Sequence, residues 1–273
     1  MTPTTGQRSS PPERRVRFRA LHESGTFVIP NPYDLGTTRL LTTLGFSALA
    51  TTSAGYAATL GRMDMNVNRE EIVGHALLLA AATDLPLNVD AERCFADDLP
   101  GVAETVFLLA DAGASGVSIE DWNPATNAID AIDIATERVA AAAEAARRNG
   151  VVLTARSENL LHGIIDLDDT ITRLCAYRDA GAEVVYAPGL TDLDEIRRVV
   201  DEVRVPMNVL LSPNGPSVEE LAAVGVRRVS TGGLLSHVAL GAMVAAARCL
   251  LDTGRIGTSV LLPRDLAKRA FTR

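Results

Sequence analysis

The chain has 273 residues, of which 47% are hydrophobic and 22% are charged, values that are typical of globular proteins and exclude the disordered and fibrous classes. Its formal net charge of −8 provides no basic excess that could neutralise phosphates, so we expect no nucleic-acid partner. The sole lysine is Lys268, near the C-terminus, which argues against Schiff-base lyases and pyridoxal enzymes because both need a lysine in the active site.

Cysteine usage and apolar segments predict where the protein resides. The three cysteines are far apart in the sequence, which indicates neither a zinc ribbon nor a disulfide framework and suits a reducing compartment. The N-terminal segment lacks the apolar region of a signal peptide, and the longest apolar stretch, near Ala239–Leu251, is short and contains Arg248. We therefore expect a cytoplasmic protein without a membrane partner.

Short β-branched runs alternate with longer stretches rich in Ala, Leu and Arg. The runs predict strands at Thr26–Asn31, Phe46–Thr52, Pro86–Asp90, Gly116–Glu120, Val151–Arg156, Glu183–Ala187, Pro206–Leu211 and Val226–Thr231. The longer stretches predict helices at Arg69–Thr83, Leu99–Ala112, Ile132–Asn149, Leu167–Ala180, Asp192–Val203, Ser217–Ala223 and, as the last barrel helix, Val238–Leu251. Residues 1–12 are expected to be a disordered tail, and residues 13–273 a single domain that ends in the extension Asp252–Arg273.

This alternation predicts the architecture. Strands that alternate with helices form parallel sheets with right-handed crossovers. Eight such units in a chain of this length predict an α/β fold of the (β/α)₈ TIM-barrel type. A doubly wound open sheet is the alternative, but no G-x-G-x-x-G motif follows the first strand.

Polar residues close most of the predicted strands, and in such barrels the carboxyl ends of the strands carry the active site. These polar segments are Asn31–Asp34, Thr52–Tyr56, Asp90–Glu92, Glu120–Asp121, Arg156–Glu158, Asn208 and Thr231–Gly233.

The acids among these strand ends suggest a divalent cation. Asp90, Glu92 and Glu120 have no lysine nearby, and Mg²⁺ prefers one or two carboxylates together with water and substrate oxygens. Arg156 suits a bidentate contact with a carboxylate or phosphonate, and Ser53 could stabilise a developing enolate oxygen.

Simpler roles remain open for each of these residues. Strand-end acids also serve as helix caps, Arg156 could do no more than neutralise the acids, and Ser53 and Gly55 could be turn residues. Cys94 fits packing better than chemistry, and His162 and His237 could be structural or could contact substrate.

Several segments together resemble the isocitrate lyase/phosphoenolpyruvate mutase superfamily, over about Phe18 to Leu251. They are FRALHESGTFVIPNPYD, GFSALATTSAGYAATLGRMD, PLNVDAE, AGASGVSIED, LTARSE and VPMNVL. The resemblance implies a (β/α)₈ barrel, with a C-terminal helix exchanged between the subunits of a homodimer or homotetramer. It also implies Mg²⁺, with Mn²⁺ as a substitute, and a 2-oxo or 2-hydroxy acid handled through a pyruvate-enolate-like species.

The resemblance also implies roles for individual residues. Asp90 and Glu120 match metal-binding acids, Asp64 an outer acid of the metal site, and Glu92 the second acid of the pair after strand three. Ser53 and Gly55 match the loop that holds the substrate carboxylate and enolate oxygen, and Arg156 matches the anion-binding arginine. Arg156, Ser53, Asn127 and Glu92 are thus the expected catalytic residues, and the expected substrate contacts are Ser53, Gly55, Tyr33, Arg156, Asn208 and His237.

The loop after the fourth strand is expected to cover the site. We hypothesise that Asn127 contacts the departing or transferred group and that Trp122 reports closure of the loop. Alternatively, Asn127 is a turn residue or caps the helix that begins near Asp130.

Departures from the family motifs indicate the subfamily. The Lys-Lys-Cys-Gly-His loop of isocitrate lyases is absent, the usual Gly-Tyr-Gly after the acid pair is replaced, and Ala125 stands where the mutases have a lysine, while Asn208 in its P-x-N pattern resembles the decarboxylase and lyase branches. We therefore expect a Mg²⁺-dependent lyase that cleaves or decarboxylates a C–C bond of a small 2-oxo or 2-hydroxy (di)carboxylic acid. The alternatives are a P–C bond enzyme like phosphoenolpyruvate mutase or phosphonopyruvate hydrolase, and a non-catalytic barrel that binds a metabolite.

Overall fold

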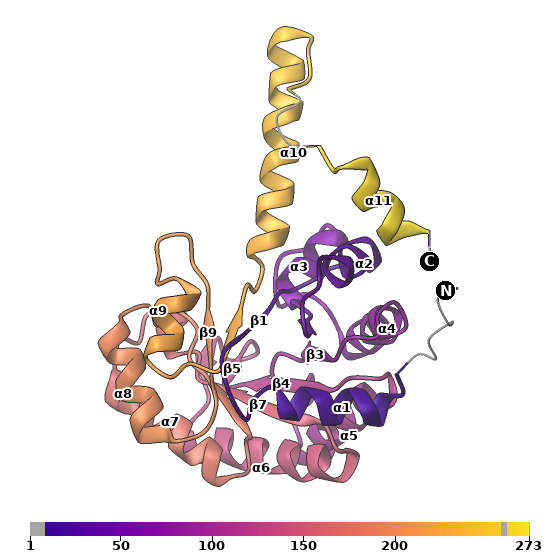
Figure 1. Ribbon diagram of the computed structural model, residues 1–273. Coiled ribbons are helices and arrows are strands. Elements are labelled where there is room, and N and C mark those ends of the chain that lie inside the picture. The colour runs from indigo at the N-terminus through magenta and orange to yellow at the C-terminus, as the bar shows by residue number, and fades with distance from the viewer. Residues whose placement is uncertain (1–8, 258–260, 273) are drawn as a thin grey trace.

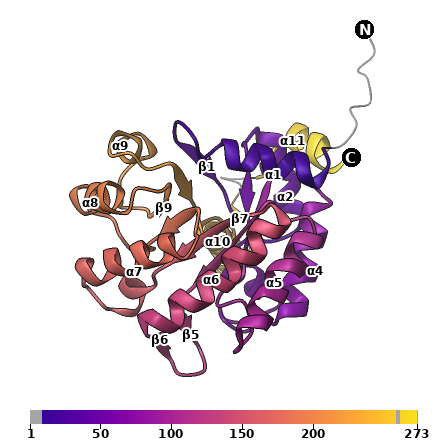
Figure 2. The ribbon, with the colours of Figure 1, turned by 90° about the horizontal axis from the view of Figure 1, so that it is seen from below.

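The structure is a computed structural model, and it describes residues 9–257 and 261–272. Its centre is an eight-stranded parallel sheet in the order β1-β10-β9-β8-β7-β4-β3-β2, curved into a barrel and surrounded by helices (Figure 1, Figure 2). The eight predicted strands are all present, so the predicted TIM-barrel fold is confirmed. The strands are β1 (Phe27–Ile29), β2 (Leu49–Ala50), β3 (Leu87–Asp90), β4 (Gly116–Glu120), β7 (Val152–Arg156), β8 (Val184–Tyr186), β9 (Met207–Leu210) and β10 (Arg228–Ser230).

The barrel is nearly closed. Parallel ladders join each neighbouring pair from β1 through β10 to β2. Between β1 and β2 themselves, the described chain forms no ladder, and the contact consists of the Ala50 amide donating to the Pro30 carbonyl at 3.1 Å and the Asn31 side chain donating to the Thr51 carbonyl at 2.7 Å. We call this junction the seam.

Helices follow the strands and cover the outside of the barrel. Most begin at a Ser, Asp, Asn or Thr whose side chain accepts a hydrogen bond from the first turn, as Asp34 does from the Thr37 amide at 2.7 Å. The covering helices are α2 (Leu35–Leu44), α3 (Ser53–Thr59), α4 (Arg69–Ala80), α5 (Leu99–Asp111), α6 (Ile132–Asn149), α7 (Leu167–Asp179), α8 (Leu193–Val203) and α9 (Val218–Ala223), with the 3₁₀ turn η1 (Asn159–His162) before α7.

Helix α1 (Pro11–Ala20) lies across the amino-terminal end of the barrel. Its Phe18 is fully buried and meets the His22 ring edge-on, with 4.9 Å between the centroids. Of the expected disordered tail, residues 1–8 lie outside the described residues, whereas Pro11 and Pro12 already form the first turn of α1.

The predicted last barrel helix is wrong in its packing. Helix α10 (Leu234–Thr253) projects away from the barrel, and of its residues Ser236 alone is buried (Figure 1). Most of its residues are apolar, so its pattern predicted burial, but no other element within residues 9–257 and 261–272 covers it. In the described part of the chain, α10 is the one helix long and apolar enough to cross a membrane, on length and composition only. Helix α11 (Arg264–Phe271) returns to pack on α2 and buries Ala270.

A small hairpin, which the sequence did not predict, follows β4. Strands β5 (Trp122–Asn123) and β6 (Ala128–Ile129) pair antiparallel, with Trp122 opposite Ile129. Each has two residues, too few to show a period of two in the sequence. Asn127 is in its turn, with a positive φ of 53°.

Candidate functional site

A cavity of about 440 Å³ opens at the carboxyl ends of the barrel strands. Every strand of the eight-stranded sheet contributes to its lining, from Ile29 of β1 to Ser230 of β10. Within β3, β4, β9 and β10 the lining residues are two apart, because alternate side chains of a strand point into the barrel. The cavity therefore collects the polar residues that close the predicted strands.

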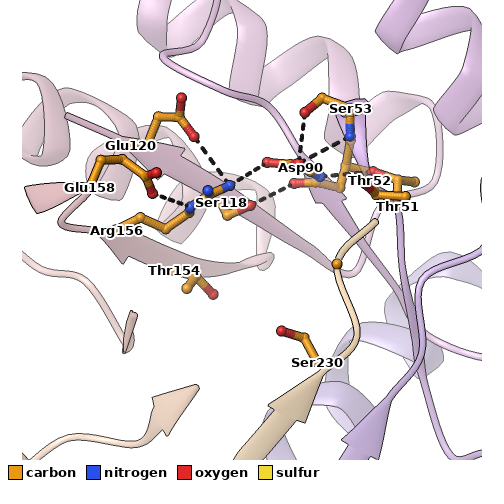
Figure 3. Close-up of polar contacts among 12 residues, drawn as sticks. Thr51, Thr52, Ser53, Asp90, Ser118, Glu120, Thr154, Arg156, Glu158 and Ser230 are labelled. Carbon is orange, nitrogen blue, oxygen red and sulfur yellow. Dashed lines mark hydrogen bonds and ion pairs between the residues drawn. The ribbon is translucent and has the colours of Figure 1, made fainter. Parts of the chain in front are cut away.

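Arg156, at the end of β7, connects three carboxylates in this cavity (Figure 3). Its Nη1 is 2.9 Å from Asp90 Oδ1 and 3.1 Å from Glu120 Oε2, and its Nε donates to Glu158 Oε1 at 2.8 Å. The guanidinium also lies over the Tyr186 ring, 5.2 Å from its centroid. The residue predicted to hold a substrate anion is thus paired with acids of the protein itself.

Glu158 is in turn held by the strand-end acid Asp121. The buried Asp121 carboxylate accepts a hydrogen bond from the Glu158 amide at 2.8 Å and another from the Tyr177 hydroxyl at 2.6 Å. Burial raises the pKa of Asp121, although these hydrogen bonds and the nearby Arg173 favour its charged form. Asp121 therefore supports the arrangement around Arg156 and does not line the cavity.

Ser53, at the start of α3, connects two acids on the opposite side of the cavity. Its hydroxyl is 3.1 Å from Asp90 Oδ2 and 3.2 Å from Asp64 Oδ1, and its amide donates to Asp90 at 3.1 Å. Burial and the neighbouring Asp90 charge raise the pKa of Asp64. The serine thus holds two carboxylates close together despite their repulsion.

Glu92 follows the end of β3 and is buried in the same acid cluster. Its backbone adopts the left-handed conformation, with a φ of 46°, and its Oε1 has no hydrogen-bond partner in the described structure. Burial, followed by the charges of Asp90 and Asp64, raises its pKa to about 8. Glu92 does not line the cavity.

The cluster carries more negative than positive charge. Asp64, Asp90, Glu92, Glu120 and Glu158 surround one guanidinium, that of Arg156. A buried carboxylate with an unpartnered oxygen needs a cation or a proton. No three His, Cys, Asp or Glu side chains of the described chain converge tightly enough to enclose a metal by themselves. The residues therefore fit Mg²⁺, which keeps most of its oxygen ligands for water and substrate.

The wall of the cavity formed by β9 and β10 is polar and has no acidic side chain among its lining residues. Asn208 of β9 donates to Ser230 Oγ of β10 at 2.9 Å and accepts from Arg228 Nε at 2.9 Å. Thr154 and Ser230 face the space below Arg156 (Figure 3). This wall offers hydroxyl and amide groups to a bound molecule.

At the mouth of the cavity, two rings from different loops stack on each other. The Trp122 and His162 rings have centroids 3.4 Å apart and planes inclined by 8°. Both residues line the cavity, and desolvation lowers the pKa of His162. The hairpin is thereby attached to the loop that follows Arg156.

Comparison with known proteins identifies the family. The profile of the phosphoenolpyruvate phosphomutase family matches residues 18–251. The chain belongs to this family. The resemblance to the isocitrate lyase/phosphoenolpyruvate mutase superfamily is therefore confirmed.

Relatives of this phosphomutase-family protein include lyases and hydrolases. A structure from Burkholderia cenocepacia J2315, provisionally assigned as a lyase/mutase, superposes with a TM-score of 0.92 at 49% identity, covering 96% of this chain and 97% of that one. Oxaloacetate acetylhydrolase in complex with oxalate superposes with a TM-score of 0.85 at 27% identity, covering 96% and 95%. An oxaloacetate decarboxylase of Chromohalobacter salexigens is 27% identical over 271 residues, which cover 94% of this chain and 91% of the relative.

The fold of this protein brings six of the predicted site residues to the cavity, and five others do not line it. Ser53, Asp64, Asp90, Glu120, Arg156 and Asn208 line it. Tyr33, Gly55, Glu92, Asn127 and His237 do not.

Gly55 shows why a motif glycine need not contact substrate. Its amide donates to Thr52 Oγ1 at 3.3 Å, and a Cβ there would lie 2.6 Å from Thr52 Cγ2 and 2.9 Å from Tyr33 Cβ. The glycine is therefore required for packing of α3 against the loop after β1. His237 is exposed on α10, and Asn127 is exposed in the hairpin turn.

The residues that the sequence analysis missed lie deeper along the strands. Ser118, Thr154 and Ser230 each point into the barrel, and Arg228 lines the base of the cavity. The signal was present, since Ser118 and Thr154 precede Glu120 and Arg156 by two residues, the spacing that places side chains on one face of a strand.

Proposed function

We propose that the protein is a Mg²⁺-dependent lyase that cleaves or decarboxylates a C–C bond of a small 2-oxo or 2-hydroxy (di)carboxylic acid through a pyruvate-enolate-like intermediate. The observation that carries the proposal is the buried acid cluster around Arg156 and Ser53, which has excess negative charge and lies beside a polar wall without acidic side chains. The relatives named oxaloacetate decarboxylase and oxaloacetate acetylhydrolase support it, because both names specify a 2-oxo dicarboxylic acid.

In this proposal Asp90 and Glu120 hold the cation, with Asp64 in an outer position. Mn²⁺ has a similar preference for oxygen ligands and could replace Mg²⁺. When bound, the cation supplies a Lewis acid that favours the negative charge left on the substrate oxygen as the C–C bond breaks. A cation held there would also offset the Asp90 charge, which after burial is the next cause that raises the pKa of Asp64.

Residues of the chain bind the substrate, stabilise the enolate and exclude water. Arg156 exchanges part of its pairing with Glu158 and Glu120 for a substrate carboxylate, and Ser53 donates its hydroxyl to the enolate oxygen. The Trp122–His162 stack at the mouth limits access of water to the enolate. The electron pair of the broken bond stays on the enolate, which a proton then quenches.

Cleavage of a P–C bond is the second candidate, favoured by the phosphomutase profile that matches residues 18–251. Ala125 argues against P–C bond cleavage. The mutases have a lysine at this position, and that lysine would supply a positive charge near a phosphoryl group.

Product analysis separates the candidates. The enzyme with Mg²⁺ is incubated with oxaloacetate, and pyruvate, acetate and oxalate are quantified; phosphonopyruvate is followed in parallel by ³¹P NMR. We expect oxaloacetate turnover that EDTA abolishes. Because Mg²⁺ alone promotes some decarboxylation, the Asp90→Ala variant is the control. Phosphonopyruvate turnover alone would support the second candidate, and ligand-induced thermal stabilisation without either reaction would indicate a non-catalytic binding barrel.

We further propose that the protein is a cytoplasmic homodimer or homotetramer in which α10 is exchanged between subunits. The apolar side chains that α10 exposes, among them Val238 and Met243 at 60% each, support a second copy as the covering surface. The proposed partners are thus a second chain and the small acid, with neither a membrane nor nucleic acid.

A further inference from the structure

At its base the cavity reaches a second arginine, Arg228 of β10. This side chain is 3% exposed, and each of its observed partners is uncharged. Its Nε donates to Asn208 Oδ1 at 2.9 Å, its Nη2 donates to Thr154 Oγ1 at 3.0 Å, and its Nη1 is 3.5 Å from His22 Nε2. Burial beside Arg228 lowers the pKa of His22 to about 3, so this ring is neutral at physiological pH.

The two arginines of the cavity differ in their counter-charges. Arg156 contacts three carboxylates, whereas no acidic side chain in the described ranges pairs with Arg228. Burial lowers the pKa of Arg228 to about 9, which still leaves it protonated at neutral pH. A buried charge is costly without an opposite charge, and a guanidinium has more N–H donors than the neutral groups around Arg228 accept. Among the described residues, the Arg228 guanidinium therefore has neutral partners and no anionic one.

Contacts within the barrel place Arg228 directly below the acid cluster. Thr154, which accepts from Arg228, precedes Arg156 by two residues on β7. Two residues of a strand correspond to roughly 7 Å, so the Arg228 guanidinium lies about that far below Arg156 along the strand. Thr154 and Ser230 carry hydroxyl groups below Arg156 (Figure 3), and Ser230 lines the cavity.

We propose that Arg228 binds the distal carboxylate of the substrate, which is therefore a dicarboxylate that points this group down into the barrel. The inference rests on the proposed function, in which the reacting end of the same molecule lies at Arg156 and Ser53. A single arginine among neutral amide and hydroxyl groups matches the single charge of a carboxylate better than the double charge of a phosphonate.

Binding of unreactive acids tests this assignment. Succinate and butyrate differ in one terminal group, a carboxylate in the first and a methyl in the second. Their affinities are measured by calorimetry at saturating Mg²⁺. We expect the wild-type protein to bind succinate about tenfold or more tightly than butyrate, and Arg228→Gln to bring the two affinities close together. Arg228→Lys keeps the charge and should retain part of the preference.

Arg227→Gln is the matched control, because Arg227 precedes Arg228 in the chain but extends its guanidinium to the Gly25 carbonyl at the surface. It should keep the full preference. Melting curves check that each variant is folded. A purely structural role for Arg228 would weaken both acids equally or lower only the melting temperature, and this result would overturn the proposal.

The wild-type measurement stands even if a variant fails to fold, since equal affinities for succinate and butyrate contradict the proposal without any substitution. If the proposed lyase function is wrong but the role of Arg228 is right, the results differ. In that case succinate would still be preferred through Arg228, while oxaloacetate would remain unchanged beyond the rate seen with the Asp90→Ala control.

Discussion

Arg156 is the side chain on which the charge balance of the cavity depends. Its Nε contacts Glu158, which follows its own strand, and its Nη1 contacts Glu120 of the neighbouring strand β4 and Asp90 of β3, one strand further. Such an arrangement requires a planar group with donors in fixed directions, which lysine lacks.

We therefore expect Arg156→Lys to fold but to lose about tenfold or more of kcat/KM, since a hydrogen bond to a charged group contributes roughly 1.5–3 kcal/mol. Steady-state kinetics measure this loss. Arg148→Lys is the control, because Arg148 forms an exposed ion pair with Glu144 on α6. Unchanged kcat/KM in Arg156→Lys would assign Arg156 a purely structural role.

Asp90 is the acid that both Arg156 and Ser53 contact. We expect Asp90→Ala to abolish detectable Mg²⁺ binding, because a site with few protein ligands cannot replace a carboxylate. Calorimetric titration of the folded variant measures this. Asp97→Ala makes the same chemical change at a fully exposed side chain and should bind Mg²⁺ like the wild type. Equal Mg²⁺ affinity in Asp90→Ala and wild type would refute the assignment of the metal site.

At the scale of elements, we expect the β5–β6 hairpin to change position when a ligand binds. None of its residues, 122–129, is buried, and it contacts the site through the stack of Trp122 on His162. Because Trp122 is the sole tryptophan, tryptophan emission reports on the environment of this residue alone.

We expect Trp122 fluorescence to change when Mg²⁺ and a 2-oxo acid bind together, as the ligand alters the environment of the stacked rings. The His162→Ala variant should show a different starting emission and a smaller response. If the emission of the wild type stays constant on ligand binding, the hairpin is a fixed wall and does not close.

The elements also show what the sequence could and could not predict. Strands such as Val151–Arg156 were predictable because a β-branched run lies between a helix and a polar turn, and their polar ends then located Asp90, Glu120 and Arg156 together. The hairpin was too short for any period. The role of Gly55 depended on a contact with Tyr33 that a local pattern does not contain. Arg228 was hidden within a strand whose neighbours are known only from the barrel register.

For the whole molecule, the proposed assembly depends on α10. The sequence correctly predicted an apolar helix here, but the described residues contain no surface that covers it, so its packing could not be inferred from its pattern. We expect the protein with Val238→Glu and Met243→Glu to be monomeric, because two charges would have to be buried in the interface. Light scattering after size-exclusion chromatography measures the mass. Val16→Glu, at an equally exposed apolar position on α1, should leave the assembly intact. A monomeric wild type would contradict the proposed exchange.

The stability of the whole molecule should depend on pH through its buried histidines. Burial lowers the pKa of His22 to about 3 and that of His75 to about 4, below the value of 6.5 expected in the unfolded chain. The unfolded chain therefore binds more protons below pH 6.5, and the folded state loses stability as the pH falls from 6.5 toward these values, by at most about 1.4 kcal/mol per unit for each histidine. Above pH 6.5 this contribution is constant.

Urea unfolding of wild type and His22→Gln at pH 7.5, 6 and 5 isolates the contribution of His22. The difference in unfolding free energy between the two proteins should change as the pH falls, in the direction that favours the variant. His237→Gln removes an exposed histidine on α10 and should parallel the wild type. A constant difference between wild type and His22→Gln would mean that His22 already titrates normally in the folded protein.

The seam between β1 and β2 has a consequence for where the barrel opens locally. A continuous ladder shares any deformation among its strands, whereas the seam relies on one backbone hydrogen bond and on Asn31, whose amide oxygen accepts from the amides of Thr231 and Gly232. Local opening should start where the fewest hydrogen bonds must break. Asp90 and Arg156 lie on strands that both pair with β4, on the laddered part of the sheet. Small openings at the seam can thus exchange solvent or product on the β1–β2 side while the ion pairs of Arg156 remain formed.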